Sequence, residues 1–329
     1  MRSRFNLATR GAEGPKGLRL VLAPFALSVA LTGSIKAAQP DAISLAGAVD
    51  FHCHTGPDTG PRAMNSLVAV RQLRSAGLRA VVLKHHFMPT SALAQLAMEE
   101  VGGIEVFGGL VLNRSAGGIN AEAVRRMAQV TGKRGRVVWL PTFDAEHQVR
   151  LTKENRPAVA VVRDGRPVPE MAEVFQVIAE NDLVLATGHS SPEESLVLLE
   201  AARRAGVKRL LVTHAITPRW RVSAAQMKTM AALGATLELI WHNHMPPPTR
   251  ATGGPPATAP MAIAVAVDAV RAAGAEHFLI SSDLGQVGSP PHAEGLRAFA
   301  VALRTGGLDE REIDLVLRKN PARLLGLEP

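Results

Sequence analysis

A chain of 329 residues with 47% apolar and 20% charged side chains can bury a large core, which argues against a largely disordered protein. Six basic residues and one acidic residue lie among the first 40, so most of the net charge of +8 is local. The rest of the chain is only mildly basic and contains few aromatic residues, so a nucleic-acid partner is not expected. The single cysteine, Cys53, excludes an internal disulfide.

Residues 1–45 differ in character from the rest of the chain. Scattered basic residues precede the apolar run LRLVLAPFALSVALTG, and small residues follow it, which is the pattern of a signal peptide. The run is too short for a stable membrane span. Two interpretations of this segment remain: a leader of an exported protein, or a disordered extension of a cytoplasmic protein. We therefore assign 1–45 to an N-terminal extension and 46–329 to a single folded domain.

From residue 48 onward, short apolar runs alternate with amphipathic patterns. Most of these runs are continuous in Val, Leu and Ile, which is typical of parallel strands that are covered on both faces. The predicted strands are 48–54, 79–86, 104–113, 136–142, 183–190, 209–215, 235–242 and 277–283.

Helical patterns lie between the predicted strands. In 191–206, Ser191 is the expected N-cap and Pro192 opens the first turn. Further helices are predicted over 64–76, 169–181, 223–234, 262–274, 292–305 and 309–319.

The alternation of eight strands with helices favours an α/β protein with a (β/α)8 TIM barrel. The rival fold is an open doubly wound sheet, which usually has a Gly-rich phosphate turn after its first strand. The segment HTGPDTGPRAM lacks that fingerprint. The Pro-rich segment 244–260 is predicted to be a long loop or lid after the seventh strand.

Most histidines of the chain lie at the ends of predicted strands. The carboxyl ends of all strands meet at one mouth of such a barrel, so these side chains are expected to converge there. Neutral imidazoles together with a carboxylate are suitable ligands for a divalent metal ion. The residues at strand ends are His52, His54, His85, His86, His189, His214, His242, His244 and Asp283.

The order of these residues resembles that of the amidohydrolase superfamily of metal-dependent hydrolases. That order is His-x-His on strand one, single histidines on strands five and six, and an aspartate on strand eight. The segments HTGPD, VVLKHH, TGHSSPEE and SSDLGQ are similar to those of a poorly characterised amidohydrolase-like group. KNPARLLGLEP resembles the terminal helix of the superfamily. The resemblance spans about 48–327 and implies the following metal ligands: His52, His54, His189, His214 and Asp283. It also implies that Asp283 moves the proton of the attacking water.

The sequence departs from the superfamily at the ligand that bridges two metal ions. Binuclear members usually take a carboxylated lysine from strand four, but WLPTFDA offers Asp144 and no lysine there. Lys84 on strand two, followed by His86, is the candidate for a bridge. A contact with a substrate anion and a plain ion pair are the alternatives for Lys84. One or two ions are therefore expected, with Zn²⁺ first and Mn²⁺ or Fe²⁺ as alternatives.

Other polar residues near the predicted mouth are candidates for binding the substrate. Arginine can clamp a carboxylate or phosphate through its planar fork, and amides can orient a substrate. The alternative for each is an ion pair or hydrogen bond within a loop. The candidates are Arg62, Asn113, Arg114, Asp144 and Gln286.

These observations predict a metal-dependent hydrolase that cleaves an amide, lactone or related carbonyl bond in a small molecule. Three alternatives remain open: a phosphoesterase of the polymerase and histidinol phosphatase type, a decarboxylase on the same scaffold, and a metal-binding barrel without catalysis. No stable membrane span is expected, and a homo-oligomer is left open.

Overall fold

The computed structural model describes residues 43–245 and 259–328. The predicted signal-peptide pattern lies outside the described residues, as does nearly all of the predicted loop 244–260. Within the described part of the chain, no helix has the length and hydropathy needed to cross a membrane.

Eight strands of the described chain form one sheet in the order β1-β2-β3-β4-β7-β8-β9-β10, with parallel neighbours. The strands are β1 Val49–Cys53, β2 Ala80–Leu83, β3 Glu105–Val111, β4 Gly135–Trp139, β7 Val184–Ala186, β8 Arg209–Val212, β9 Ala235–Ile240 and β10 Phe278–Ser281. All eight predicted strands are confirmed. Each is shorter than its apolar run, because the last residues of the run leave the ladder and begin the loops at the carboxyl end.

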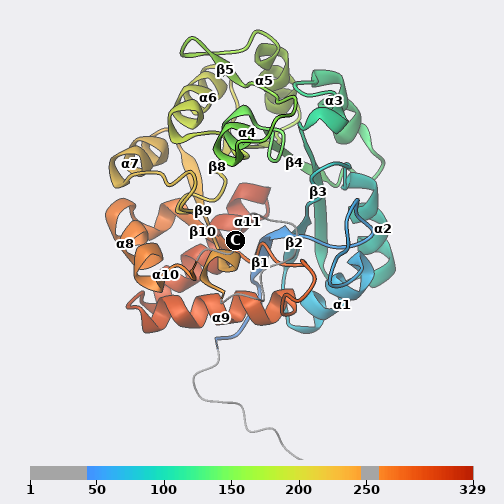
Figure 1. Ribbon diagram of the computed structural model, residues 1–329. Coiled ribbons are helices and arrows are strands. Elements are labelled where there is room, and N and C mark those ends of the chain that lie inside the picture. Colours follow the sequence, from blue (N-terminus) through green and yellow to red (C-terminus); the bar gives the residue numbers. More distant parts are fainter. Residues whose placement is uncertain (1–42, 246–258, 329) are drawn as a thin grey trace, which may run out of the picture. The chain divides into compact units, whose positions relative to one another are not determined.

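The sheet closes on itself between its first and last strands. The N–H of Asp283 donates to the carbonyl oxygen of His52 (2.9 Å), and the N–H of His54 donates to that of Leu284 (2.9 Å). Figure 1 shows the helices arranged as a ring around the strands. The predicted TIM barrel is therefore confirmed, and the bonds that close it lie at the predicted metal ligands.

The helices predicted over 64–76, 169–181, 191–206, 223–234, 262–274 and 292–305 are confirmed, and the one predicted over 309–319 begins at Glu310. The helices over 91–101, 121–129 and 146–152 were not predicted. The described helices are arranged around the barrel (Figure 1). They are α1 Ser66–Ser75, α2 Ser91–Val101, α3 Ala121–Gln129, α4 Glu146–Thr152, α5 Met171–Glu180, α6 Pro192–Arg204, α7 Ala224–Ala232, α8 Ile263–Ala273, α9 His292–Thr305, α10 Glu310–Asp314 and α11 Asn320–Leu325. The predicted cap of α6 is a capping box, in which the Oγ of Ser191 accepts from the N–H of Glu194 (3.1 Å) and Glu194 accepts from the N–H of Ser191 (2.8 Å). A short hairpin, β5 Val162–Arg163 and β6 Arg166–Pro167, was not predicted.

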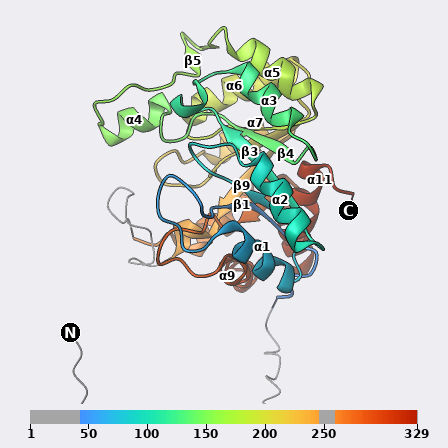
Figure 2. The same cartoon turned by 90° about the vertical axis from the view of Figure 1, so that its right-hand side faces the viewer.

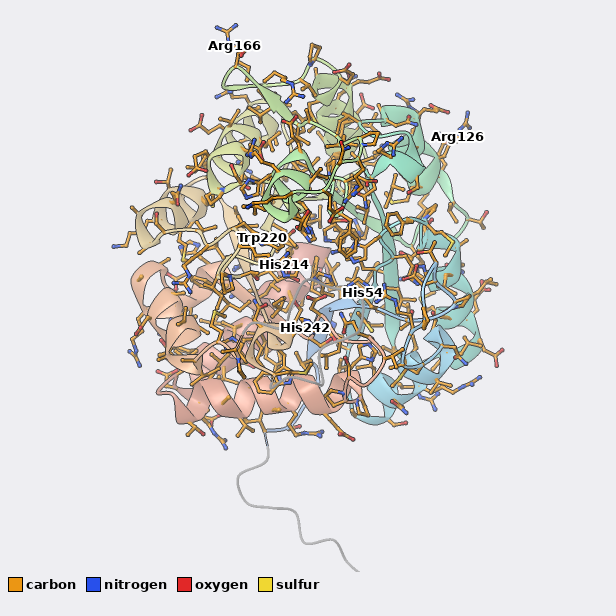
Figure 3. The ribbon with its side chains drawn as sticks, viewed as in Figure 1. His54, Arg126, Arg166, His214, Trp220 and His242 are labelled. Carbon is orange, nitrogen blue, oxygen red and sulfur yellow. The ribbon has the colours of Figure 1, made fainter. Side chains whose placement is uncertain are left out.

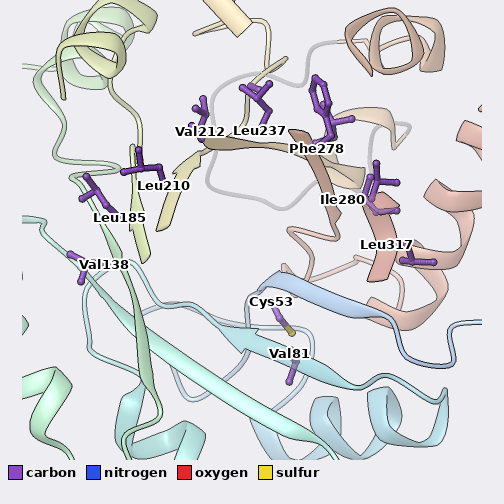
Figure 4. Close-up of a cluster of buried hydrophobic side chains, with 14 of the residues drawn as sticks. Cys53, Val81, Val138, Leu185, Leu210, Val212, Leu237, Phe278, Ile280 and Leu317 are labelled. Atoms are coloured by element: carbon purple, nitrogen blue, oxygen red, sulfur yellow. The ribbon is translucent and has the colours of Figure 1, made fainter. Parts of the chain in front are cut away.

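Two apolar clusters hold these layers together. The larger one packs between strands and helices and includes Val81 and Cys53 (Figure 4). The smaller one fills the barrel interior and includes Val82 and Trp139, together with Leu325 of α11. Figure 2 shows α11 and α4 on opposite sides of the barrel. The apolar packing with α11 therefore lies at the amino ends of the strands, and polar side chains are left for the carboxyl ends.

Candidate metal centre

Two residues at the mouth adopt a backbone conformation that is uncommon for side chains other than glycine. His214 follows β8 with a φ of 57°, and Asp283 follows β10 with a φ of 51°. Non-glycine residues in this left-handed region carry strain that is often found at functional sites. The two side chains lie next to each other, with Nδ1 of His214 3.9 Å from Oδ2 of Asp283.

The two histidines of β1 and its following turn converge on one carboxylate oxygen. Nε2 of His52 and Nε2 of His54 each lie 3.1 Å from Oδ1 of Asp283. Both rings are buried, and Asp283 is only 7% exposed. Figure 3 shows His54 and His214 near the centre of the ring of strands, far from the peripheral Arg126 and Arg166. Three atoms that commonly bind metals therefore share one small buried region.

The hydrogen bond of His54 to Lys84 is compatible with a cation between these atoms. Nδ1 of His54 donates to the carbonyl oxygen of Lys84 (2.9 Å), so a neutral ring carries its lone pair on Nε2. Burial lowers the pKa of His54 to about 3, so this ring is neutral near pH 7. A lone pair that faces a carboxylate oxygen is repulsive unless positive charge lies between them. Ligand atoms of a tetrahedral Zn²⁺ site are about 3.3 Å apart, which is close to the observed spacing.

His189 and His214 provide further nitrogen atoms beside this cluster. Their ring centroids are 5.5 Å apart, and His189 stacks on Trp220 with a centroid separation of 4.6 Å. Nδ1 of each ring is buried without a hydrogen-bond partner in the described chain. Burial is also the main cause that lowers the pKa of His214 to about 3. Buried, neutral and unpaired imidazole nitrogens are suited to a metal ion.

Lys84 continues the inward-facing row of β2 and reaches the same cluster. Its side chain is fully buried, and Nζ lies 3.0 Å from Nε2 of His52 and 5.3 Å from the ring centroid of Trp139. No carboxylate lies within ion-pair distance of Nζ in the described residues. Burial lowers the pKa of Lys84 to about 8, although the charges of Asp283 and Glu238 oppose this shift. Lys84, the candidate for the bridge between two metal ions, thus contacts the predicted ligand His52.

The sequence over residues 47–238 matches a family of unknown function, DUF6282. This chain belongs to the DUF6282 family. The match includes His52, His54, His189 and His214 and ends before Asp283. No curated protein matches the sequence.

Solved structures share the barrel of this DUF6282 chain at low sequence identity. An organophosphorus hydrolase from Deinococcus radiodurans is 16% identical with a TM-score of 0.54, over 86% of this chain and 93% of that one. A probable dipeptidase from Pseudomonas aeruginosa is 12% identical with a TM-score of 0.58, over 85% and 94% of the two chains. A phosphotriesterase homology protein from Escherichia coli, complexed with phosphate in its active site, is 16% identical with a TM-score of 0.55, over 86% and 100%. At these identities, the likeness shows the fold.

His86 lies at the edge of the histidine cluster of the DUF6282 chain. Its ring centroid is 4.9 Å from that of His54, and its Nδ1 lies 2.9 Å from Oγ1 of Thr142. Asn113 is fully buried behind it and donates from Nδ2 to Thr142 Oγ1 and to the carbonyl oxygen of His86, both at 2.9 Å. Its Oδ1 accepts from the backbone N–H groups of Thr142 and Asp144. Asn113 therefore joins the loops after β2, β3 and β4.

The other predicted substrate residues of the DUF6282 chain make contacts within loops. The Nε–H of Arg62 donates to Asp58 (2.8 Å), and Asp144 forms an ion pair with Arg156. Asp144 also accepts from the backbone N–H of Arg114, whose own side chain is exposed. Gln286 donates to the backbone carbonyl oxygen of Asp283 (3.0 Å).

Glu238 is a member of the cluster that the sequence analysis missed. It lies on β9, is fully buried, and places Oε1 3.1 Å from Nδ1 of His52. The available signal was a lone acidic residue within the apolar strand ATLELIWH, where an unpaired carboxylate is costly to bury.

The turn before His189 requires glycine at Gly188. Its φ is 62°, and a Cβ there would lie 2.3 Å from the backbone oxygen of Leu140. We expect Gly188→Ala to lower the free energy of unfolding by more than about 1 kcal/mol, because both the conformation and the space oppose a side chain. Urea unfolding checks this.

Gly165 offers a matched control, because it has a φ of 71° and nothing within 4 Å of an added Cβ. The free energy of unfolding should fall more in Gly188→Ala than in Gly165→Ala. Equal losses would mean that the close approach to Leu140 contributes nothing.

Proposed function

We propose that this protein is a metal-dependent hydrolase of the amidohydrolase superfamily that cleaves an amide, lactone or related carbonyl bond in a small molecule. The observation that carries the proposal is the convergence of His52 Nε2 and His54 Nε2 on one oxygen of Asp283. Its position at the carboxyl ends of barrel strands supports an active site there. The hydrolases with a similar barrel, and the likeness of the four sequence segments to an amidohydrolase-like group, also support the class.

The donor atoms suit one or two divalent ions. In this proposal His52, His54 and Asp283 hold the first ion, and His189 and His214 hold a second ion or complete the first site. Lys84 is the candidate bridge, with His86 as an outer member of the cluster. Zn²⁺ fits a set of imidazoles with a carboxylate, and Mn²⁺ or Fe²⁺ are the alternatives. Such an ion, when bound, supplies an acidified water and a polarised carbonyl group.

Asp283 is the proposed general base and acid. Its Oδ1 faces the two Nε2 atoms, whereas its Oδ2 lies 3.9 Å from His214, beyond hydrogen-bonding distance. Oδ2 would accept the proton of the attacking water and return it to the leaving group. The backbone of Asp283 is held by its N–H bond to His52 and by the amide of Gln286, so the carboxylate is positioned before the substrate arrives.

The charges around the mouth favour a carbonyl substrate over a phosphate. Arg62 is already paired with Asp58, and Phe143 and Trp220 place aromatic rings within 6 Å of the His189 ring. Arg62 is therefore already engaged and not available for phosphate oxygens, which a phosphoesterase would bind with cationic groups. The experiment below distinguishes the hydrolase from a phosphoesterase, a decarboxylase and a non-catalytic barrel.

The test combines elemental analysis of the purified full chain with a screen of amides, lactones and phosphate esters. We expect one or two divalent ions per chain, and turnover of a carbonyl substrate that stops with chelator and returns with added metal. Turnover of phosphate esters alone would favour the phosphoesterase, and release of carbon dioxide would favour the decarboxylase. A metal-loaded chain without any turnover would contradict the hydrolase.

A further inference from the structure

We propose that Glu238 is a positioning residue that holds the proton of His52 on Nδ1, so that Nε2 of the same ring keeps its lone pair for the metal ion. This inference rests on the metal site of the proposed function. It concerns a strand, β9, that supplies none of the proposed metal ligands.

The carboxylate of Glu238 contacts His52, His214 and Ser281. Oε1 accepts from the Oγ of Ser281 (2.6 Å) and lies 3.1 Å from Nδ1 of His52. Oε2 accepts from the backbone N–H of His214 (3.3 Å). In the described residues, no Lys or Arg side chain lies within ion-pair distance of Glu238. The carboxylate oxygens therefore accept from groups in and next to the cluster.

The acceptor character of a carboxylate sets the direction of these bonds. Because Oε1 of Glu238 already accepts from the Oγ of Ser281, it contacts the His52 ring as an acceptor, and the ring donates to it from Nδ1. A neutral imidazole carries one N–H group, so the lone pair of His52 is then on Nε2. Nε2 is the atom that lies 3.1 Å from Asp283 and 3.0 Å from Lys84. Glu238 thereby selects the tautomer that can bind a cation.

Glu238 also connects two ligand candidates from different strands. It contacts the ring of His52 from β1 and the backbone N–H of His214, which has a φ of 57°. Carboxylates that orient metal-binding histidines in this way typically change metal affinity by about 10–100-fold when they are removed.

Asp50 is a matched control. It is likewise a fully buried carboxylate beside the cluster, and burial raises the pKa of both acids. Asp50 accepts from the backbone N–H groups of Ser282 (2.9 Å) and His52 (3.3 Å) and, among the described residues, makes no hydrogen bond to a ring nitrogen. A purely structural role of Glu238 would therefore give both residues the same effect.

The experiment measures Zn²⁺ affinity of the full chain by competition with a chelator. We expect Glu238→Gln to weaken the affinity by about 10–100-fold at an unchanged saturating stoichiometry. Asp50→Asn should change the affinity far less, even where both variants lower the melting temperature. In the Zn²⁺-loaded unaltered chain with ¹⁵N-labelled histidine, NMR should find the His52 proton on Nδ1.

Each other outcome counts against the inference. Equal affinities in Glu238→Gln and the unaltered chain would overturn it, and so would a His52 proton on Nε2. A lost equivalent of Zn²⁺ at saturation would make Glu238 a ligand instead. An unaltered chain that takes up no metal would overturn the proposed site as well, whereas metal uptake that is insensitive to Glu238 would overturn this inference alone. If Glu238→Gln does not fold, the NMR result on the unaltered chain decides.

Discussion

Replacing His52 and His54 together with alanine is expected to abolish metal uptake by the protein. The two rings supply two of the three proposed ligand atoms, each 3.1 Å from Oδ1 of Asp283, and Asp283 alone cannot hold a divalent ion in competition with water. Elemental analysis after dialysis should find almost no metal in the double variant. The rise in melting temperature on adding Zn²⁺ should disappear as well, because a metal that binds only the native state stabilises it.

The matched control replaces two histidines that lie outside the cluster, His147 and His277. Neither contacts a proposed ligand, so the control should keep the metal content of the unaltered protein. Metal retained by the His52→Ala/His54→Ala variant, folded as judged by circular dichroism, would show that the ligands were misassigned.

Asp283→Asn is expected to keep the fold and the metal while turnover falls by about 10²–10⁴-fold, the usual contribution of a general acid or base. The amide preserves the shape of the side chain and the Oδ1 atom that faces His52 and His54, but it cannot accept and return a proton. The measurement is kcat for whichever carbonyl substrate the screen identifies, with metal content determined on the same sample.

Asp50→Asn serves as the control here too, because Asp50 is buried next to Ser282 and has no role in the proposed chemistry. Its kcat should stay within a few-fold of the unaltered value. Unchanged turnover in Asp283→Asn at full metal occupancy would refute the proton role of Asp283.

The barrel could be predicted because its strands are covered on both faces. Continuous apolar runs such as those that became β2 and β8 are typical of parallel strands, and Ser191 with Pro192 marks the start of α6 unambiguously. The β5–β6 hairpin could not be found, because strands of two residues carry no periodicity. The exact ends of the strands could not be predicted either, because each apolar run continues into the following loop.

The site could be predicted only at the level of which residues gather at the mouth. The spacing of His52 and His54 predicts a shared face, but no pattern in the sequence says that both would meet the same oxygen of Asp283. The contact between Lys84 and His52 depends on the packing of two strands. Glu238 was missed because a single acid in an apolar strand does not disturb the strand prediction.

The most direct test of the metal centre is anomalous diffraction at the zinc absorption edge from crystals of the Zn²⁺-loaded protein. We predict a peak bound by Nε2 of His52, Nε2 of His54 and a carboxylate oxygen of Asp283, at about 2.0–2.2 Å from each. Zinc bound elsewhere on the molecule, with these three side chains turned away from one another, would contradict the account.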